Sequence, residues 1–185
     1  MAAGKYRTIV ADPPWQYSTT LAVTGNAPGR TKQRGRSGTG YETLTPDEIA
    51  ALDVQQHAAD NCHLYLWTTN THAEHAWGIA RAWGFEPKNL LTWCKPPKGM
   101  VGFGVFSQAS EFCLFASRGT PGGIGRCERT WFEWPRSAHS AKPDAFLDLV
   151  EQVSPGPYLE LFARRQRLGW DTWGNEALGH VEIAS

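Results

Sequence analysis

A regular alternation of apolar, strand-like runs with helical segments most constrains how this chain can fold. The first run, Tyr6–Ala11, is apolar and ends at Asp12-Pro13-Pro14, because two prolines cannot continue a central strand. Further strands are predicted at His63–Thr68, Leu90–Cys94, Glu111–Ser117, Thr130–Trp134 and Tyr158–Phe162. Helices between them indicate an α/β fold, with a mostly parallel sheet and helices on both faces.

The helix starts carry recognisable signals. Thr45-Pro46-Asp47-Glu48 has the spacing of a capping box with proline in the first turn, and Thr71 with Glu74 repeats that spacing. The second helix is expected to run to about Trp83, where Gly84 ends it. Pro143 is expected to start a third helix that continues to about Val153.

Length and composition limit the class of protein. The chain of 185 residues suits a single domain over residues 1–185. Its four cysteines lack the paired spacing of a zinc site, so we expect no metal. It shows no signal peptide and no run that could span a membrane, so a cytoplasmic protein without membrane contact is expected.

The net charge of the chain is zero, but cations are concentrated in one segment. The 18 Lys and Arg residues equal the 18 Asp and Glu residues, which argues against a uniformly basic nucleic-acid surface. The Gly-rich segment Gly25–Gly40, however, holds four cations and no acid. We expect these side chains to contact nucleic-acid phosphates, with a mobile solvated loop as the alternative: Arg30, Lys32, Arg34 and Arg36.

Two strand ends carry most of the chemistry. Asp12 to Trp15 follows the first strand, and Glu160 to Arg164 closes the last one. Ligands of parallel α/β sheets bind at the carboxyl ends of strands, so neighbouring strands would deliver both groups to one pocket. Asp12 and the proline carbonyls are acceptors suited to a flat group that bears an NH₂, with Trp15 as a stacking face. A structural turn with Trp15 in the core is the alternative.

The motifs along the chain resemble one known family. VADPPW at 10–15 resembles the catalytic motif of methyltransferases that act on the amino groups of nucleobases. The rest resembles the family of the catalytic subunit of the eukaryotic mRNA adenosine methyltransferase, in its bacterial or phage branch. The matching segments follow in the family's order: GYETLTPDEI (40–49), LYLWTTN (64–70), WGFEPKNLLTWCK (83–95), EFCLFASRG (111–119), HSAKPDAF (139–146), VSPGPYLELFAR (153–164) and WGNE (173–176).

This resemblance implies a Rossmann-like methyltransferase fold in permuted order, with the catalytic strand before the cofactor strand. It implies S-adenosylmethionine as methyl donor and Asp12-Pro13-Pro14-Trp15 as the catalytic segment. Asp12 would contact both the target amino group and the amino group of the donor's methionine part, and Lys142 would pair with its carboxylate. The remaining cofactor contacts are expected from Glu160, Arg164, Asn175 and Glu176.

The resemblance also implies the substrate, which is the exocyclic amino group of adenine in nucleic acid. The adenine is expected in a single strand or flipped out of a duplex, and DNA is favoured over RNA for so compact a chain. Trp15 is the first candidate for stacking on the base and Tyr17 the second, while Lys95 at a strand end is expected to face the nucleic acid. The alternatives are an inactive subunit that binds nucleic acid or a partner, and methylation of cytosine. A homo- or heterodimer stays open.

Overall fold

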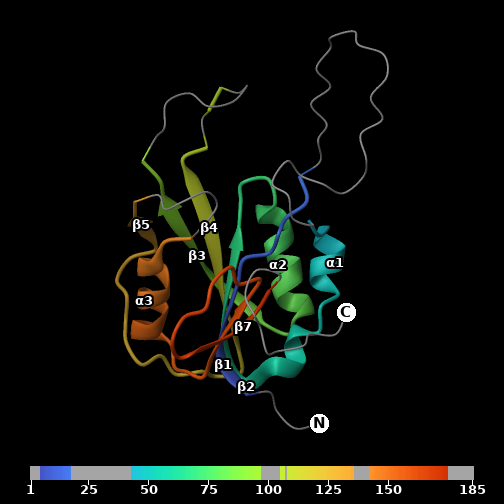
Figure 1. The fold of residues 1–185 in the computed structure, drawn as a ribbon, viewed down its shortest axis with the longest axis vertical. Coiled ribbons are helices and arrows are strands. Elements are labelled where there is room, and N and C mark those ends of the chain that lie inside the picture. Colours follow the sequence, from blue (N-terminus) through green and yellow to red (C-terminus); the bar gives the residue numbers. More distant parts are fainter. Residues whose placement is uncertain (1–4, 18–42, 97–104, 107, 136–141, 175–185) are drawn as a thin grey trace.

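The computed structural model describes residues 5–17, 43–96, 105–106, 108–135 and 142–174 (Figure 1). Within them, seven strands form one sheet in the order β5-β3-β4-β2-β1-β6-β7. The elements are β1 (Tyr6–Ala11), α1 (Pro46–Ala50), the 3₁₀ turn η1 (Val54–His57), β2 (Ala58–Thr68), α2 (Ala73–Ala82), β3 (Glu86–Cys94), β4 (Ser110–Arg118), β5 (Trp131–Glu133), α3 (Asp144–Val153), β6 (Tyr158–Leu161) and β7 (Trp170–Trp173).

The sheet is mostly parallel, as predicted. The pairs β1–β2, β1–β6, β6–β7 and β3–β5 are parallel, whereas β4 runs antiparallel to both β2 and β3. The first strand, β1, therefore lies between β2 and the late strand β6, although nearly the whole chain separates β1 from β6. This arrangement is the permuted α/β order that was expected.

Helices cover both faces of the sheet and bury two separate clusters (Figure 1). On one face, Ile9 and Leu64 pack with Ile49 of α1 and Ile79 of α2. On the other face, Val10, Tyr65 and Trp67 pack with Phe146 and Val150 of α3. Successive residues of β1 thus enter opposite clusters, because side chains alternate across a strand. Strands buried on both faces explain the nearly continuous apolar runs in the sequence.

The first predicted helix start is confirmed and the second is wrong. The Thr45 side chain accepts from the Glu48 N–H, and the Glu48 carboxylate accepts from the Thr45 N–H, which is a complete capping box. Helix α2 instead begins after His72, which makes no capping bond. A backbone bond from His72 to Thr69 already closes a turn there, so Thr71 does not occupy the cap position. Gly84 ends α2 as predicted, at φ 81°.

Some strand boundaries differ from the prediction. Strand β2 starts at Ala58, well before the predicted start at His63. The prediction missed this part because Asp60 and Asn61 are exposed polar residues and interrupt the apolar pattern of the strand. Strand β7 was not predicted at all, although Trp170 and Thr172 are buried in alternation. No helix among the described residues is long and apolar enough to cross a membrane.

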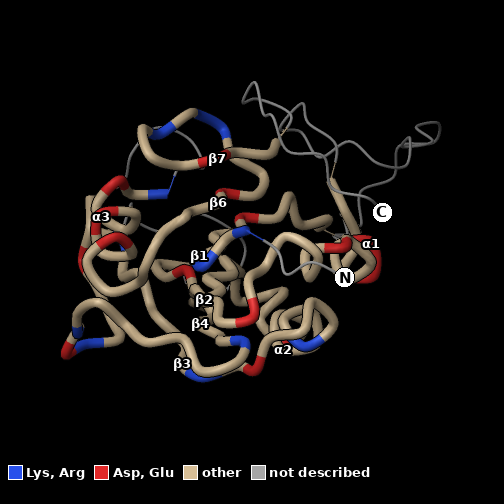
Figure 2. Tube along the Cα trace, turned by 90° about the horizontal axis from the view of Figure 1, so that it is seen from below, with Lys and Arg blue, Asp and Glu red and all other residues tan. Residues whose placement is uncertain are grey.

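Basic and acidic positions are mixed along the described chain, and no uniformly basic face is present there (Figure 2). Several of them neutralise each other locally, as where Arg167 contacts Asp148 and Glu151. Such ion pairs leave little uncompensated charge where they occur. The predicted basic segment, Arg30, Lys32, Arg34 and Arg36, lies outside the described residues.

Candidate active site

The two strand ends singled out in the sequence lie side by side. Val10 of β1 pairs with Glu160 of β6, and Ala11 pairs with Leu161. The Asp12 N–H donates to the Leu161 carbonyl at 3.4 Å, so Asp12 leaves the sheet directly beside the end of β6. The sequence prediction that one pocket receives both groups is confirmed, since Asp12, Glu160 and Arg164 all line a single cavity.

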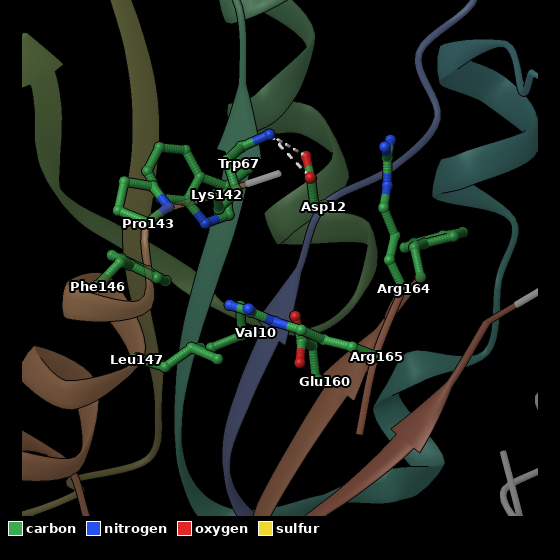
Figure 3. Close-up of a pocket in the computed structure, with 11 residues that line it drawn as sticks. Val10, Asp12, Trp67, Lys142, Pro143, Phe146, Leu147, Glu160, Arg164 and Arg165 are labelled. Carbon is green, nitrogen blue, oxygen red and sulfur yellow. Dashed lines mark hydrogen bonds and ion pairs between the residues drawn. The ribbon is translucent and has the colours of Figure 1, made fainter. Parts of the chain in front are cut away.

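This cavity has a volume of about 120 Å³ and lies between the carboxyl ends of β1 and β6 and the first turn of α3 (Figure 3). Trp67, Pro143 and Phe146 make an apolar wall on one side. Charged side chains complete the lining: Asp12, Lys142, Glu160, Arg164 and Arg165. Carboxylates and cations in one small cavity suit a ligand that itself carries both charges.

Lys142 and Asp12 form the central ion pair of the cavity. The Lys142 Nζ donates to both carboxylate oxygens of Asp12 at 2.7 Å (Figure 3). Both side chains are mostly buried, with about a fifth of their surface exposed (20% and 22%). Burial lowers the pKa of Lys142, but the charges of Asp12 and Glu111 outweigh it and leave this pKa above its ordinary value. Lys142 is thus a fixed cation at neutral pH.

Glu111, at the start of β4, is a member of this site that sequence reasoning missed. Its carboxylate lies 3.3 Å from the Lys142 Nζ and also accepts from Lys95 at 2.5 Å. Burial raises the pKa of Glu111, but the two lysines outweigh burial and hold its pKa below the ordinary value. The result is a chain of alternating charges, Lys95–Glu111–Lys142–Asp12. An acid opening an otherwise apolar strand was the available signal.

Lys95, predicted to face nucleic acid, belongs to this charged chain. Its ammonium forms an ion pair with Glu111 and lies 5.3 Å from the centre of the Trp93 ring. Only 12% of the Lys95 side chain is exposed. The structure therefore places it beside the pocket, engaged by the protein's own carboxylate. Its contact with nucleic acid stays a prediction.

Glu160 carries a buried polar atom of the cavity, its Oε2, that has no hydrogen-bond partner among the described residues. Burial, with a further contribution from the Asp12 charge, raises the pKa of Glu160 from its ordinary value of 4.5 to about 7. An unsatisfied buried carboxyl is costly for folding, so hydroxyl donors of a bound ligand would relieve it.

We therefore expect Glu160→Gln to stabilise the ligand-free protein above pH 7. Between pH 4.5 and 7 folded Glu160 holds a proton that the unfolded chain has released, so the contribution of Glu160 to stability falls across this range and is level above it. The gain should approach about 3 kcal/mol at pH 8 and vanish near pH 4. Urea unfolding across pH measures it, with exposed Glu86→Gln as control. An equal effect of Glu160→Gln at pH 4 and pH 8 would contradict this assignment.

The two aromatic residues proposed for base stacking, Trp15 and Tyr17, differ in exposure. Trp15 is only 5% exposed, its Nε1 donates to the Trp67 carbonyl at 3.2 Å, and its ring stacks on His72 at 5.0 Å. Tyr17 is 50% exposed and meets the edge of His72. The first choice for stacking on a base is thus covered by protein, and the second choice is the accessible one.

The backbone around the two prolines is already engaged. The Pro13 carbonyl accepts from the Trp15 N–H at 2.9 Å, and the Pro14 carbonyl accepts from the Leu44 N–H at 2.8 Å. A carbonyl oxygen has two lone pairs, so each can accept one more hydrogen bond. These contacts fix the segment and leave capacity at Pro13 for an amino hydrogen.

The expected cofactor residues are placed unequally. Arg164 and Arg165 line the cavity, and Arg165 is paired with Asp144. Asn175 and Glu176 lie outside the described residues. In the described part of the chain, no group of His, Cys, Asp and Glu side chains could hold a metal ion.

Comparison with known proteins decides the family. The family model described as MT-A70 matches residues 6–176, which is nearly the whole chain. The chain belongs to the MT-A70 family. This confirms the resemblance found in the sequence, and the fold agrees with it.

Individual relatives of this MT-A70 member come from bacteria, animals and plants. The Type II methyltransferase M.MunI of Mycoplasma sp. is 34% identical over 93% of this chain and 78% of its own length. The human N(6)-adenosine-methyltransferase catalytic subunit METTL3 is 28% identical over 95% of this chain but 29% of its own. The human N(6)-adenine-specific methyltransferase METTL4 is 28% identical over 94% of this chain and 38% of its own. The chain thus spans most of the bacterial relative and less than half of either human one.

Proposed function

We propose that this protein is an S-adenosylmethionine-dependent methyltransferase that acts on the exocyclic amino group of adenine in nucleic acid. The observation that carries the proposal is the Lys142–Asp12 pair inside a cavity at the carboxyl ends of β1 and β6. Family membership and the printed names of METTL3 and METTL4, which specify N(6)-adenosine and N(6)-adenine, support the reaction and the base.

The residues present fit the methyl donor. A zwitterionic methionine part needs one cation and one anion, and the adjacent Lys142 and Asp12 supply them. The unsatisfied oxygen of Glu160 suits a ribose hydroxyl, with Arg164, Asn175 and Glu176 as further contacts. The bound donor supplies an electrophilic methyl group on a sulfonium.

Asp12 and the Pro13 carbonyl then act on the adenine. The amino nitrogen is a poor nucleophile because its lone pair is delocalised into the ring. Hydrogen bonds from its two N–H groups to the Asp12 carboxylate and the Pro13 carbonyl would favour a more tetrahedral nitrogen. The lone pair of such a nitrogen would be free to attack the methyl carbon. Positioning and fixed charges therefore supply most of the rate. The base must leave its stack to reach this pocket, and exposed Tyr17 is the available ring for it.

We favour DNA over RNA as substrate. The compact chain covers 78% of the Mycoplasma methyltransferase but only 29% of METTL3, whose name specifies adenosine. The basic segment Arg30–Arg36, directly after the catalytic motif, would contact backbone phosphates of either nucleic acid. An intracellular setting follows from such a substrate.

Incubation with methyl-labelled S-adenosylmethionine and single- or double-stranded DNA or RNA tests the proposal. We expect label in nucleic acid, most in DNA, and none with heat-denatured protein. Binding of nucleic acid without any label transfer would instead support an inactive binding subunit, the alternative that an intact Asp12-Pro13-Pro14-Trp15 disfavours.

Glu111 is expected to act as a positioning residue in this reaction. Glu111 holds the Lys142 ammonium from the β4 side, so without its charge the ammonium is less firmly positioned for the donor's carboxylate. We expect Glu111→Gln to raise KM for S-adenosylmethionine about tenfold with a smaller change in kcat, because Lys142 loses one of its two carboxylate partners. Steady-state kinetics measure this, and Glu111→Asp should restore part of the affinity. A loss confined to kcat, with KM unchanged, would refute this role.

A further inference from the structure

A second cavity, of about 320 Å³, lies on the α3 face of the sheet at the other end of that helix. The first cavity touches Pro143 and Phe146 in the first turn of α3, whereas the second is lined by Val153 and Ser154 at its end. Its outer wall is the loop of residues 119–130, which runs past α3 between β4 and β5 (Figure 1). The volume falls within the range typical of small-molecule sites.

Close backbone packing builds this wall before any ligand arrives. The Ile124 N–H donates to the Val153 carbonyl at 3.1 Å. A Cβ at Gly125 would lie 2.3 Å from the carbonyl oxygen of Gln152, so only glycine allows this approach. At the start of the loop, the Thr120 N–H donates to the Asn61 side chain at 2.8 Å. The loop is therefore fastened to α3 and to β2.

Two arginines lie in the lining of the cavity. Arg126 and Arg129 both line it, both are exposed, and no carboxylate is among its described lining residues. Neither guanidinium has an ion-pair partner within the described residues, whereas Arg165 and Arg167 do. Two arginines on one rim are suited to an anion, and to phosphate in particular.

The lining is mostly apolar and includes neutral polar groups. Phe115 and Phe132 supply aromatic rings, and Asn89 supplies an amide that could pair with the edge of a ring. Behind them, Ser154 hydrogen-bonds to His63 at 2.8 Å and Tyr65 at 2.7 Å. These polar groups satisfy one another, so they add no charge to the site.

We propose that this cavity binds a nucleotide unit, with the phosphate on Arg126 and Arg129 and the base against Phe115. A planar ring that carries a phosphate combines the two properties that the lining selects. The unit has two sources, a free mononucleotide or one nucleotide of a bound strand. The inference goes beyond methyl transfer and does not depend on it, because none of these residues lines the first cavity.

Cys127 allows a direct test. This free, exposed cysteine lines the cavity, whereas Cys94 is half-buried at the other end of β3 and Cys62 and Cys113 are buried. The rate at which iodoacetamide alkylates Cys127 is measured by peptide mass spectrometry, with deoxyadenosine monophosphate or deoxyadenosine added. We expect saturable protection of Cys127 by the monophosphate, and much weaker protection by the nucleoside, which lacks the phosphate. The alkylation rate of Cys94, which lies near the first cavity, shows in the same sample whether the added nucleotide also affects that end of the sheet.

Variants and competitors complete the test. Arg126→Ala with Arg129→Ala should raise the half-protecting concentration about tenfold or more, whereas Arg81→Ala, an exposed arginine on α2, should not change it. Protection by a single-stranded oligonucleotide as well would assign the site to a bound strand, and protection by the mononucleotide alone would assign it to free nucleotide. Unprotected Cys127, or protection that survives the double substitution, would overturn the proposal.

Discussion

Replacing Asp12 by asparagine is expected to lower the rate of methyl transfer by about 10²–10³-fold, which is the usual cost of losing one preorganised charge contact at a reacting group. Asparagine keeps the size of the side chain but loses the charge that faces Lys142. It also replaces one of the two acceptor oxygens with a donor. Single-turnover transfer from labelled S-adenosylmethionine measures the effect.

The same substitution elsewhere separates catalysis from folding. Asp171→Asn removes a carboxylate that accepts from Lys5 and Tyr6 and does not line the cavity. This control should keep near-wild-type transfer. Lys142 retains Glu111 as a partner when Asp12 is neutral, so Asp12→Asn should also stay folded by circular dichroism. A folded Asp12→Asn variant with wild-type transfer would remove Asp12 from the reaction.

Truncating Trp15 to alanine is expected to destabilise the protein by about 3–5 kcal/mol, as is usual for a buried aromatic residue. The indole is 5% exposed, packs in the cluster beneath α1 and α2, and loses both its hydrogen bond to Trp67 and its stack on His72. Urea unfolding measures the loss in free energy of unfolding.

Tyr17→Ala is the matched comparison. Because half of the Tyr17 surface is exposed, its loss should change stability little but weaken binding of a single strand, at about 1–3 kcal/mol for one lost base stack. The opposite pattern, with a stable Trp15→Ala variant that loses nucleic-acid affinity, would return the stacking role to Trp15.

Local features of the fold were predictable because their causes are local. The bounds of β1 follow from an apolar run ended by two prolines, and the capping box at Thr45 needs only residues that are three apart. Gly84 ends α2 because it adopts a positive φ there. Thr71 and Glu74 have the same spacing as Thr45 and Glu48. Thr71 is nevertheless not the N-cap, because the His72 N–H closes a backbone turn on the Thr69 carbonyl and α2 begins after His72.

The site was predictable where motifs coincide with strand ends. Asp12, Glu160 and Arg164 meet because β1 and β6 are neighbours, and Lys142 reaches them from the start of α3. Glu111 was missed because its role depends on two lysines from distant segments. Which of Trp15 and Tyr17 is accessible for base stacking depends on burial, and burial is determined only by the packed sheet. Strand β7 likewise owes its pairing to β6 rather than to a strong pattern of its own.

The most direct test of the central claim is the identity of the methylated nucleoside. DNA and RNA incubated with the protein and S-adenosylmethionine are digested to nucleosides and analysed by mass spectrometry, in parallel with the Asp12→Asn variant. We predict adenine methylated on its exocyclic nitrogen with the wild-type protein and almost none with the variant. Methylation of the cytosine amino group, or equal product from both proteins, would contradict the proposed reaction at Asp12.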